Sequence, residues 1–312
     1  MSAITAELVR QLREKSGAGM MDCKKALQEN GGDLEASVDW LRKKGLAAAA
    51  KKAGRIAAEG LVAIATSGPK GVVVEVNSET DFVGRNEHFQ NFVKECATQA
   101  LKLSSFETSA LSEAPCTVGE APKIGEELTR LVATIGENMS LRRLTSLEVS
   151  QGCVVPYMHN QVALNLGKIG VLVALESNAS NEALTELGKK IAMHIAATNP
   201  QSLSVEDLDA QSVERERNVI ADQARASGRP EDIIQKMVEG RLRKFYEEVV
   251  LLEQSFVMDP SLQVKAVIEQ AAKDLGTPVT LKGYIRYALG EGIEKAASDF
   301  AAEVQAQAGL AG

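Results

Sequence analysis

The chain has 312 residues, a mass of 33.3 kDa and a formal net charge of -7, with 45% hydrophobic and 25% charged residues. These values are typical of a globular protein with two or three structural units, and they exclude a chain that is disordered throughout. The 42 acidic residues outnumber the 35 basic ones and aromatic residues make up only 4%, so we expect no direct binding of nucleic acid.

The N-terminal stretch carries Glu7 and Arg10, so we interpret it as an amphipathic helix rather than a signal peptide. No apolar run approaches the roughly 20 residues that span a bilayer. Reduced thiols are favoured over a zinc site or disulfides, because no metal-ligand or C-x-x-C spacing occurs among Cys23, Cys96, Cys116 and Cys153. We therefore expect a cytoplasmic protein with no membrane contact, no metal and no cofactor.

Apolar residues at helical spacing predict three short helices in the first fifty residues. These residues are Ile4, Leu8 and Leu12, then Met20, Cys23 and Leu27, then Leu34, Val38 and Leu41. Asp33 is well placed as the N-cap of the third helix, and residues 43–45 (KKG) are typical of its C-terminus. The pattern predicts a compact helical domain over residues 1–54, with residues 46–58 forming a helical or flexible connector.

Met20 and Met21 stand just after a glycine turn, at the start of the second predicted helix. Neighbouring residues on a helix differ in direction by about 100°, so both cannot face inward. We expect one methionine in the core and the other partly exposed, where its flexible side chain could contact a partner.

Two strand patterns, residues 71–76 (GVVVEV) and residues 170–175 (GVLVAL), recur 99 residues apart. Each follows a shorter strand-like run, residues 61–65 and 162–166, so we expect two hairpins. A helix follows each hairpin in the same register, and later strands are expected at residues 141–149 and 279–289. The pattern predicts an α+β protein with two related subdomains, residues 55–150 and 151–290, each an antiparallel sheet covered by helices on one face.

The second subdomain contains a mostly helical insertion at about residues 206–248. Residues 206–226 predict a polar helix, Gly228 ends it, and Pro230 stands at the first position of the next helix. Such a hairpin would protrude from the protein. It is either a simple packing hairpin or an arm for oligomerisation or partner binding.

One segment breaks the similarity between the two subdomains. The first has Thr80-Asp81-Phe82-Val83 between strand and helix, and the offset of 99 places residues 179–182 (ASNE) at the same point of the second. The fold therefore does not require an aromatic residue in this turn. Phe82 either packs over its own helix or is an exposed tip that enters a pocket of another protein, where its burial is worth roughly 1.5–3 kcal/mol.

Sequence motifs of nucleotide-binding loops, dinucleotide-binding folds, zinc proteases and serine hydrolases are absent from the sequence. Nothing positive in the sequence thus indicates an enzyme.

Two long stretches resemble signatures of the bacterial elongation factor Ts family. Residues 12–27 (LREKSGAGMMDCKKAL) resemble its N-terminal signature, and residues 75–83 (EVNSETDFV) resemble its second signature. Shorter stretches resemble the family in the same order along the chain: 135–138 (IGEN), 193–197 (MHIAA), 236–241 (KMVEGR), 254–258 (QSFVM) and 290–294 (GEGIE). The resemblance spans nearly the whole chain, although residues 104–122 carry no distinctive motif.

The resemblance implies a guanine-nucleotide exchange factor for the GTPase elongation factor Tu, without covalent chemistry of its own. Such a factor binds the GDP-bound GTPase, displaces magnesium and promotes GDP release so that GTP can bind. The resemblance also implies that residues 1–54 form a domain like the ubiquitin-associated (UBA) domain, that the hairpin is a coiled-coil arm, and that residues 291–312 form a C-terminal helical module.

The resemblance assigns roles to individual residues as well. In the family, the T-D-F-V segment inserts its phenylalanine between helices of the GTPase and disturbs its magnesium site, which implies this role for Thr80, Asp81, Phe82 and Val83. The N-terminal signature contacts the GTPase domain, and our candidates for this contact are Leu12, Met20, Met21 and Lys24. The second subdomain contacts another domain of the GTPase, with His194 and Ile195 as candidates.

A different class of function remains as the alternative. The chain could be a non-catalytic scaffold or a chaperone-like protein-binding module, with its helical domain and hairpin mediating assembly. The residues also leave open whether the chain is monomeric or forms a homodimer through the hairpin.

Overall fold

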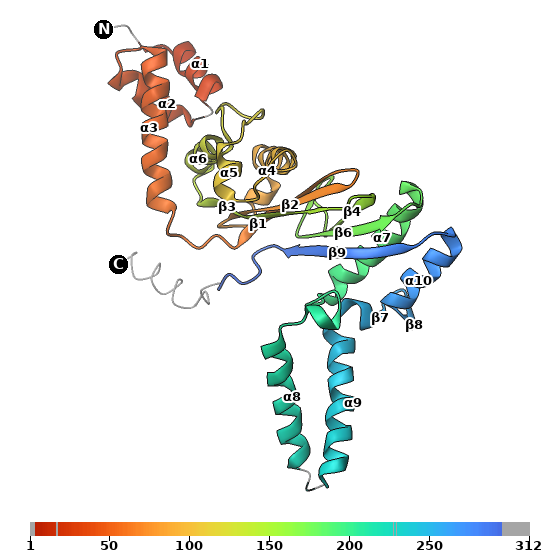
Figure 1. The fold of residues 1–312 in the computed structure, drawn as a ribbon. Coiled ribbons are helices and arrows are strands. Elements are labelled where there is room, and N and C mark those ends of the chain that lie inside the picture. The colour runs from red at the N-terminus through yellow and green to blue at the C-terminus, as the bar shows by residue number, and fades with distance from the viewer. Residues whose placement is uncertain (1–3, 17, 227, 229, 295–312) are drawn as a thin grey trace.

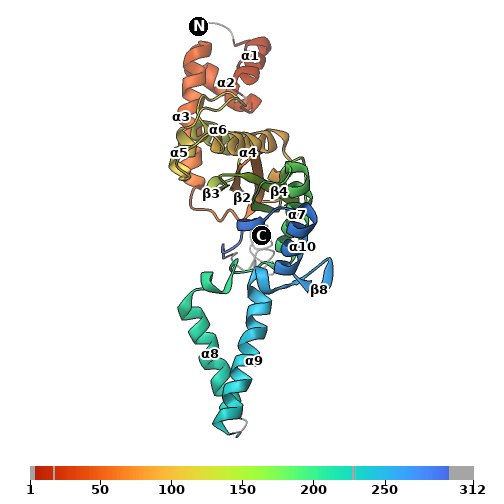
Figure 2. The same ribbon diagram turned by 45° about the vertical axis from the view of Figure 1, so that its right-hand side comes forward.

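The computed structural model describes residues 4–16, 18–226, 228 and 230–294. Three N-terminal helices lie at one end of an elongated molecule, two sheets with covering helices lie in the middle, and a long helical hairpin extends from the other end (Figure 1, Figure 2). The fold is α+β with antiparallel sheets, as the sequence predicted. No helix in the described part of the chain is long and apolar enough to cross a membrane.

The three N-terminal helices are α1 (Ala6–Ser16), α2 (Met20–Glu29) and α3 (Leu34–Lys52). They pack around a small set of buried residues: Val9, Leu12, Cys23, Ala26 and Leu27. Asp33 caps α3 as predicted, because its carboxylate accepts a hydrogen bond of 2.8 Å from the backbone N–H of Ala36.

The first sheet contains β1 (Glu59–Ser67), β2 (Lys70–Ser78) and β3 (Met139–Glu148). Its outer face is covered by α4 (Glu87–Ala100), α5 (Thr108–Glu113) and α6 (Ile124–Ile135). We call this sheet and its helices the N core. The hairpin of β1 and β2 and the later strand β3 match the prediction.

The second sheet contains β4 (Gly152–His159), β6 (Ile169–Ser177) and β9 (Val279–Ala288). Its outer face is covered by α7 (Asn181–Thr198) and α10 (Val264–Leu275), and we call this unit the C core. Shorter elements complete the chain: β5 (Leu166–Gly167), β7 (Ser255–Phe256), β8 (Asp259–Gln263) and the 3-10 turns η1 (Val83–Arg85), η2 (Val205–Asp207) and η3 (Leu251–Glu253).

The third helix does not end at Gly45, so that prediction was wrong. The helix α3 continues through Gly45, and its C-terminal half packs along α6. A Cβ atom at position 45 would lie 3.2 Å from the Cβ of Ala133 on α6, so the glycine allows two helices to approach closely. An ion pair of 2.6 Å between Arg42 and Glu126 joins the same two helices.

One strand of the C core was also predicted wrongly. Residues 162–166 were expected to pair with β6, but β4 is its partner, and the two-residue β5 joins the edge of the first sheet beside β1. Pro156 lies inside β4 and argues against a central strand, because proline has no N–H to donate. The strand order β4-β6-β9 makes β4 an edge strand, where a proline is tolerated.

The two sheets pack face to face, which explains why their strands are apolar almost without interruption. In β2, Val72 and Val74 face the helices of the N core, whereas Val73 faces the other sheet. In β6, Val171 faces the helices of the C core and Leu172 faces β2 and its neighbours. A strand buried on both faces does not need polar residues at alternate positions.

Gly71 and Gly170, which lie 99 residues apart, occupy matching positions in the contact between the sheets. A Cβ atom on Gly71 would lie 2.7 Å from Cγ1 of Val154, and one on Gly170 would lie 2.8 Å from Cγ1 of Val62. Each sheet thus lacks one side chain where a valine of the other sheet approaches. The strand registers also match, because each sheet has an irregularity at the same offset, after Glu75 and after Ala174.

The hairpin consists of α8 (Ala210–Arg225) and α9 (Glu231–Val249). Its first helix begins four residues later than predicted, because the side chain of Asp209 accepts the N–H of Ser212 and caps it. Gly228 lies in the turn with a φ of +67°, and Pro230 is the N-cap of α9 rather than its first helical residue. The hairpin projects away from both sheets, as predicted (Figure 1, Figure 2). Most of the predicted C-terminal helical module lies outside the described residues.

Candidate functional site

The connection between strand and helix in the N core is longer than its counterpart in the C core. In the N core, β2 ends at Ser78 and α4 begins at Glu87, whereas in the C core β6 ends at Ser177 and α7 begins at Asn181. The first turn of α7 thus occupies the place of the loop and the turn η1. We call residues 79–86 the Phe82 loop.

Phe82 lies at the tip of this loop with 71% of its surface exposed. The alternative in which its ring packs over its own helix is therefore wrong. The guanidinium carbon of Arg85 lies 6.0 Å from the centre of the ring, and Arg85 also lies 3.8 Å from the carboxylate of Asp81. The next residue, Val83, is buried in the N core and anchors the loop beside its exposed tip.

The far end of the loop is fixed by backbone contacts. The N–H of Arg85 donates to the carbonyl of Phe82 at 3.0 Å, and the side-chain amide of Gln90 donates to the carbonyl of Gly84 at 2.9 Å. Asn86 caps α4, because its side-chain oxygen accepts from the N–H groups of the second and third residues of that helix. The loop is thus ordered although its tip is exposed.

The near end of the loop is held by the turn that connects α6 to β3. Glu137 accepts hydrogen bonds from the backbone N–H of Thr80 at 2.8 Å and from its hydroxyl at 2.6 Å. Glu79 accepts one of 2.5 Å from the backbone N–H of Asn138. Two segments far apart in the sequence therefore bind each other at the base of the loop.

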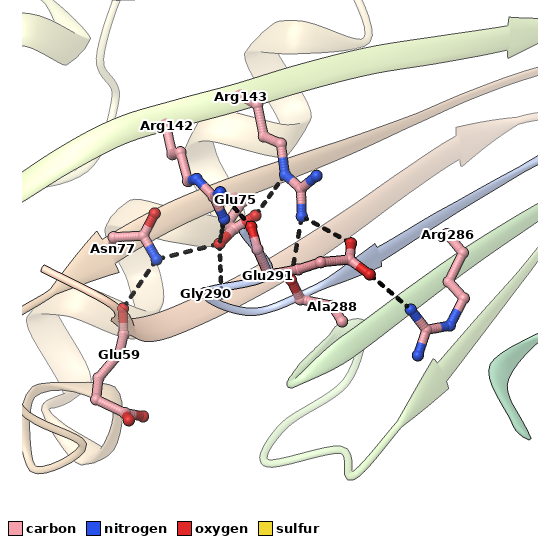
Figure 3. Close-up of polar contacts among 9 residues, drawn as sticks. All are labelled: Glu59, Glu75, Asn77, Arg142, Arg143, Arg286, Ala288, Gly290 and Glu291. Carbon is pink, nitrogen blue, oxygen red and sulfur yellow. Dashed lines mark hydrogen bonds and ion pairs between the residues drawn. The ribbon is translucent and has the colours of Figure 1, made fainter. Parts of the chain in front are cut away.

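Glu75 lies on β2, the strand that leads into the loop (Figure 3). Its side chain is fully buried. Its carboxylate accepts hydrogen bonds from Arg142 at 2.9 Å, from Arg143 at 2.6 Å and from the backbone N–H of Gly290 at 2.8 Å. Burial alone raises the pKa of Glu75, but the hydrogen bonds from Gly290, Arg143 and Arg142 outweigh it, and the pKa is lowered.

The same arginines connect the strands of the two cores. Arg143 donates to the carbonyl of Ala288 at 3.1 Å and its guanidinium lies 4.0 Å from the centre of the Tyr287 ring, both at the end of β9. Glu291 lies 3.4 Å from Arg143 and 3.3 Å from Arg286 (Figure 3). The strand β2 is thus tied to the end of β9 by an ionic network around the buried carboxylate of Glu75.

The candidates in the N-terminal helices divide into one core residue and three surface residues. Leu12 is completely buried, whereas Met20 and Met21 are 59% and 76% exposed and Lys24 is exposed as well. We expected one methionine in the core, and that was wrong. The buried face of α2 is formed by Cys23, Ala26 and Leu27, so both methionines point outward.

His194 and Ile195, the candidates in the C core, are both completely buried, so neither side chain is available for direct contact. His194 shares a hydrogen bond of 2.8 Å with Gln254, and its Nδ1 accepts the backbone N–H of Val257 at 3.2 Å. Burial lowers the pKa of His194 and so favours its neutral form. The histidine therefore supports the turn between β7 and β8.

This turn carries exposed residues that were not among the site residues predicted from the sequence. Val257 and Met258 are 44% and 45% exposed, and Met193, next to His194 on α7, is 39% exposed. The signal was present in the sequence, since residues 254–258 are one of the stretches that resemble the family.

The described residues contain no group of three or more His, Cys, Asp or Glu side chains that could hold a metal ion.

Comparison with known proteins gives one consistent family. Residues 79–291 match the family model described as "Elongation factor TS". The chain is similar to proteins named "Elongation factor Ts" from Rhodospirillum centenum, with 60% identity over 99% of this chain and 100% of the relative, and from Paramagnetospirillum magneticum, with 59% identity over 99% and 98%. The protein of that name from Rhodospirillum rubrum is 59% identical over 98% of this chain and 99% of the relative.

Proposed function

The chain belongs to the elongation factor Ts family, and we propose that its Phe82 loop is the element that opens the nucleotide site of elongation factor Tu. As a member of this family it is a guanine-nucleotide exchange factor of translation elongation in the cytoplasm, and it is not an enzyme. It binds elongation factor Tu and promotes release of GDP so that GTP can bind. The observation that carries our proposal is the 71% exposure of Phe82 on a loop that the C core lacks.

Exchange by such a loop requires no catalytic group. Burial of a phenylalanine side chain is worth roughly 1.5–3 kcal/mol, and this energy is gained only when a pocket of the GTPase accepts the ring. If that pocket opens in the nucleotide-free state, the factor binds that state more tightly. By linkage, GDP and the factor then weaken each other's binding by the same factor.

We assign the insertion to Thr80, Asp81, Phe82 and Val83 in different roles. Phe82 enters the GTPase, Val83 anchors the loop in the N core, and Thr80 fixes the start of the loop. The exposed carboxylate of Asp81 is a second group that the loop brings to the GTPase. A bound magnesium ion is the largest local charge in a nucleotide site, so displacing it would weaken the hold on GDP.

Two further surfaces complete the proposed contact. At the N-terminal end, Met20, Met21 and Lys24 are exposed on α2, and Leu12 supports them from the core. In the C core, the exposed residues are Met193, Val257 and Met258, while His194 and Ile195 act from below as supports. Methionine suits such surfaces because its side chain adapts to its partner.

We also propose the finer organisation of the chain. Residues 1–54 are a UBA-like domain, residues 55–150 and 151–290 are two related subdomains, and residues 291–312 are a C-terminal module. The matching glycines and strand irregularities of the two sheets support their relation. The projecting hairpin is an arm for contact with another protein, and pairing of two chains through it remains a prediction.

The test measures release of labelled GDP from elongation factor Tu in a stopped-flow instrument. We expect Phe82→Ala to lower the maximal release rate about tenfold, since it removes an interaction worth at least about 1.4 kcal/mol. The matched control is Leu164→Ala, which truncates a side chain that is 75% exposed on another loop, and we expect no change in rate. A wild-type rate for Phe82→Ala at an unchanged melting temperature would contradict the proposal.

A further inference from the structure

Glu137 lies on the turn between α6 and β3, and it holds the start of the Phe82 loop with both carboxylate oxygens. One oxygen accepts the backbone N–H of Thr80 at 2.8 Å, and the other accepts the hydroxyl of Thr80 at 2.6 Å. Both donors belong to one residue, so the carboxylate fixes the backbone and the side chain of Thr80 together.

The neighbouring residues make the reverse contact. The backbone N–H of Asn138 donates to the carboxylate of Glu79 at 2.5 Å, and the side-chain amide of Asn138 donates to the carbonyl of Arg55 at 2.7 Å. Two carboxylates and two backbone amides therefore connect residues 79–80 to residues 137–138. Hydrogen bonds to an ionised carboxylate are roughly twice as strong as neutral ones, so this connection is firm.

The position of this connection gives it a consequence for Phe82. Thr80 lies two residues before Phe82, at the point where the chain leaves β2, so the backbone direction at Thr80 sets where the loop tip points. A binding segment that is ordered before it meets its partner loses less conformational entropy on binding. Loss of the hydrogen bonds between Thr80 and Glu137 would therefore reduce the fraction of molecules in which the Phe82 ring has the conformation that enters the partner.

We propose that Glu137 is a positioning residue for nucleotide exchange, which acts through Thr80 to keep the exposed Phe82 ring in the conformation that enters the partner. This inference rests on the proposed role of Phe82 and adds a residue to it from a segment 55 positions further along the chain.

The test is a double-mutant cycle with Glu137→Ala, Phe82→Ala and the double variant, measured as the maximal rate of labelled-GDP release at saturating factor. We expect Glu137→Ala to lower this rate about tenfold, as the loss of charge-assisted hydrogen bonds predicts. The double variant should be no slower than Phe82→Ala, because Glu137 acts only through the ring. Glu137→Gln keeps an oxygen for the N–H of Thr80 and should recover most of the rate.

A second readout does not depend on activity. Hydrogen exchange of the Thr80 amide should be faster in Glu137→Ala and unchanged in Glu148→Ala, a matched control that removes an exposed glutamate at the other end of β3. The control should also exchange nucleotide at the wild-type rate.

The outcomes separate this inference from the proposal on which it rests. A wild-type rate for Phe82→Ala would overturn the role of Phe82 itself. If Phe82→Ala is slow, then a wild-type rate for Glu137→Ala, or a double variant in which the two losses multiply, would overturn the role of Glu137 alone. A lower melting temperature of Glu137→Ala with unchanged amide exchange at Thr80 would also overturn it.

Discussion

The N core and the C core connect a strand of the sheet to the following helix in two different ways. In the C core, three residues join β6 to α7, and Ser180 caps the helix by accepting the N–H of Ala183. In the N core, eight residues join β2 to α4, and the additional residues place Phe82 in solvent. The short connection of the C core shows what the fold requires. The longer connection of the N core therefore contains residues that the fold does not require.

A second difference lies at the strand irregularity just before this connection. Glu75 of the N core corresponds to Ala174 of the C core, and both stand on the face where the two sheets meet. The alanine fills its site with no polar group, whereas the glutamate brings in Arg142, Arg143 and the N–H of Gly290. The strand that carries the Phe82 loop is thus held by a network that its counterpart lacks.

The largest effect is expected when this second difference is removed. Glu75→Ala gives the N core the residue of the C core but leaves Arg142 and Arg143 without their buried partner. Breaking a buried pair in this way costs about 3–5 kcal/mol, and we expect a loss of that size in the free energy of unfolding, measured by urea denaturation. Glu148→Ala is the control, and a loss as small as in that control would show that the network is not needed.

A smaller and symmetric effect is expected at the contact between the sheets. Gly71→Ala and Gly170→Ala would each place a methyl group within 3 Å of a valine of the opposite sheet. Such overpacking costs typically about 1–3 kcal/mol, and the two variants should lose comparable amounts of unfolding free energy in the same urea experiment. If one substitution is tolerated and the other is not, the two positions are not equivalent.

The smallest expected effect is on the pH dependence of stability, because different groups titrate in the two cores. Burial lowers the pKa of His194 from its ordinary value of 6.5. As the pH falls below about 6.5, the unfolded chain therefore binds a proton at this histidine before the folded protein does, and the free energy of unfolding decreases. The pKa of Glu75 is lowered from 4.5, so its contribution is lost only below about pH 4.5. Melting temperatures between pH 7 and 5 should therefore decline less in His194→Gln than in the wild type, and equal declines would contradict this assignment.

The sequence predicted most of the fold because local patterns specify it. The strands of β2 and β6 stand out as apolar runs at a constant offset, and Gly228 and Asp33 mark a turn and a helix start by their backbone and capping chemistry. The errors have physical causes as well. Pro156 is tolerated only because β4 is an edge strand, and Gly45 serves close packing against α6, and neither fact is visible before the tertiary contacts form.

The candidate site was predictable in part for the same reason. The missing counterpart of Phe82 indicated an exposed tip without any structure, and that exposure is confirmed. Burial of His194 was not predictable, because the turn that covers it comes from about sixty residues further along the chain. Glu137, the partner of Thr80, is 57 residues away in the sequence, and Gly290, one partner of Glu75, is 215 residues away. The pattern of a single sequence contains no signal for such pairs.

The most direct test replaces the Phe82 loop by its counterpart. Residues 79–86 (ETDFVGRN) and 178–185 (NASNEALT) have equal length and lie 99 residues apart, so the second segment can be placed in the first position without changing the register. The measurement is the rate of labelled-GDP release from elongation factor Tu with the chimera, after its circular dichroism spectrum and melting have been compared with those of the wild type. We predict a folded chimera that leaves GDP release at its spontaneous rate. A folded chimera that accelerates release as the wild type does would contradict the claim that this loop carries the exchange function.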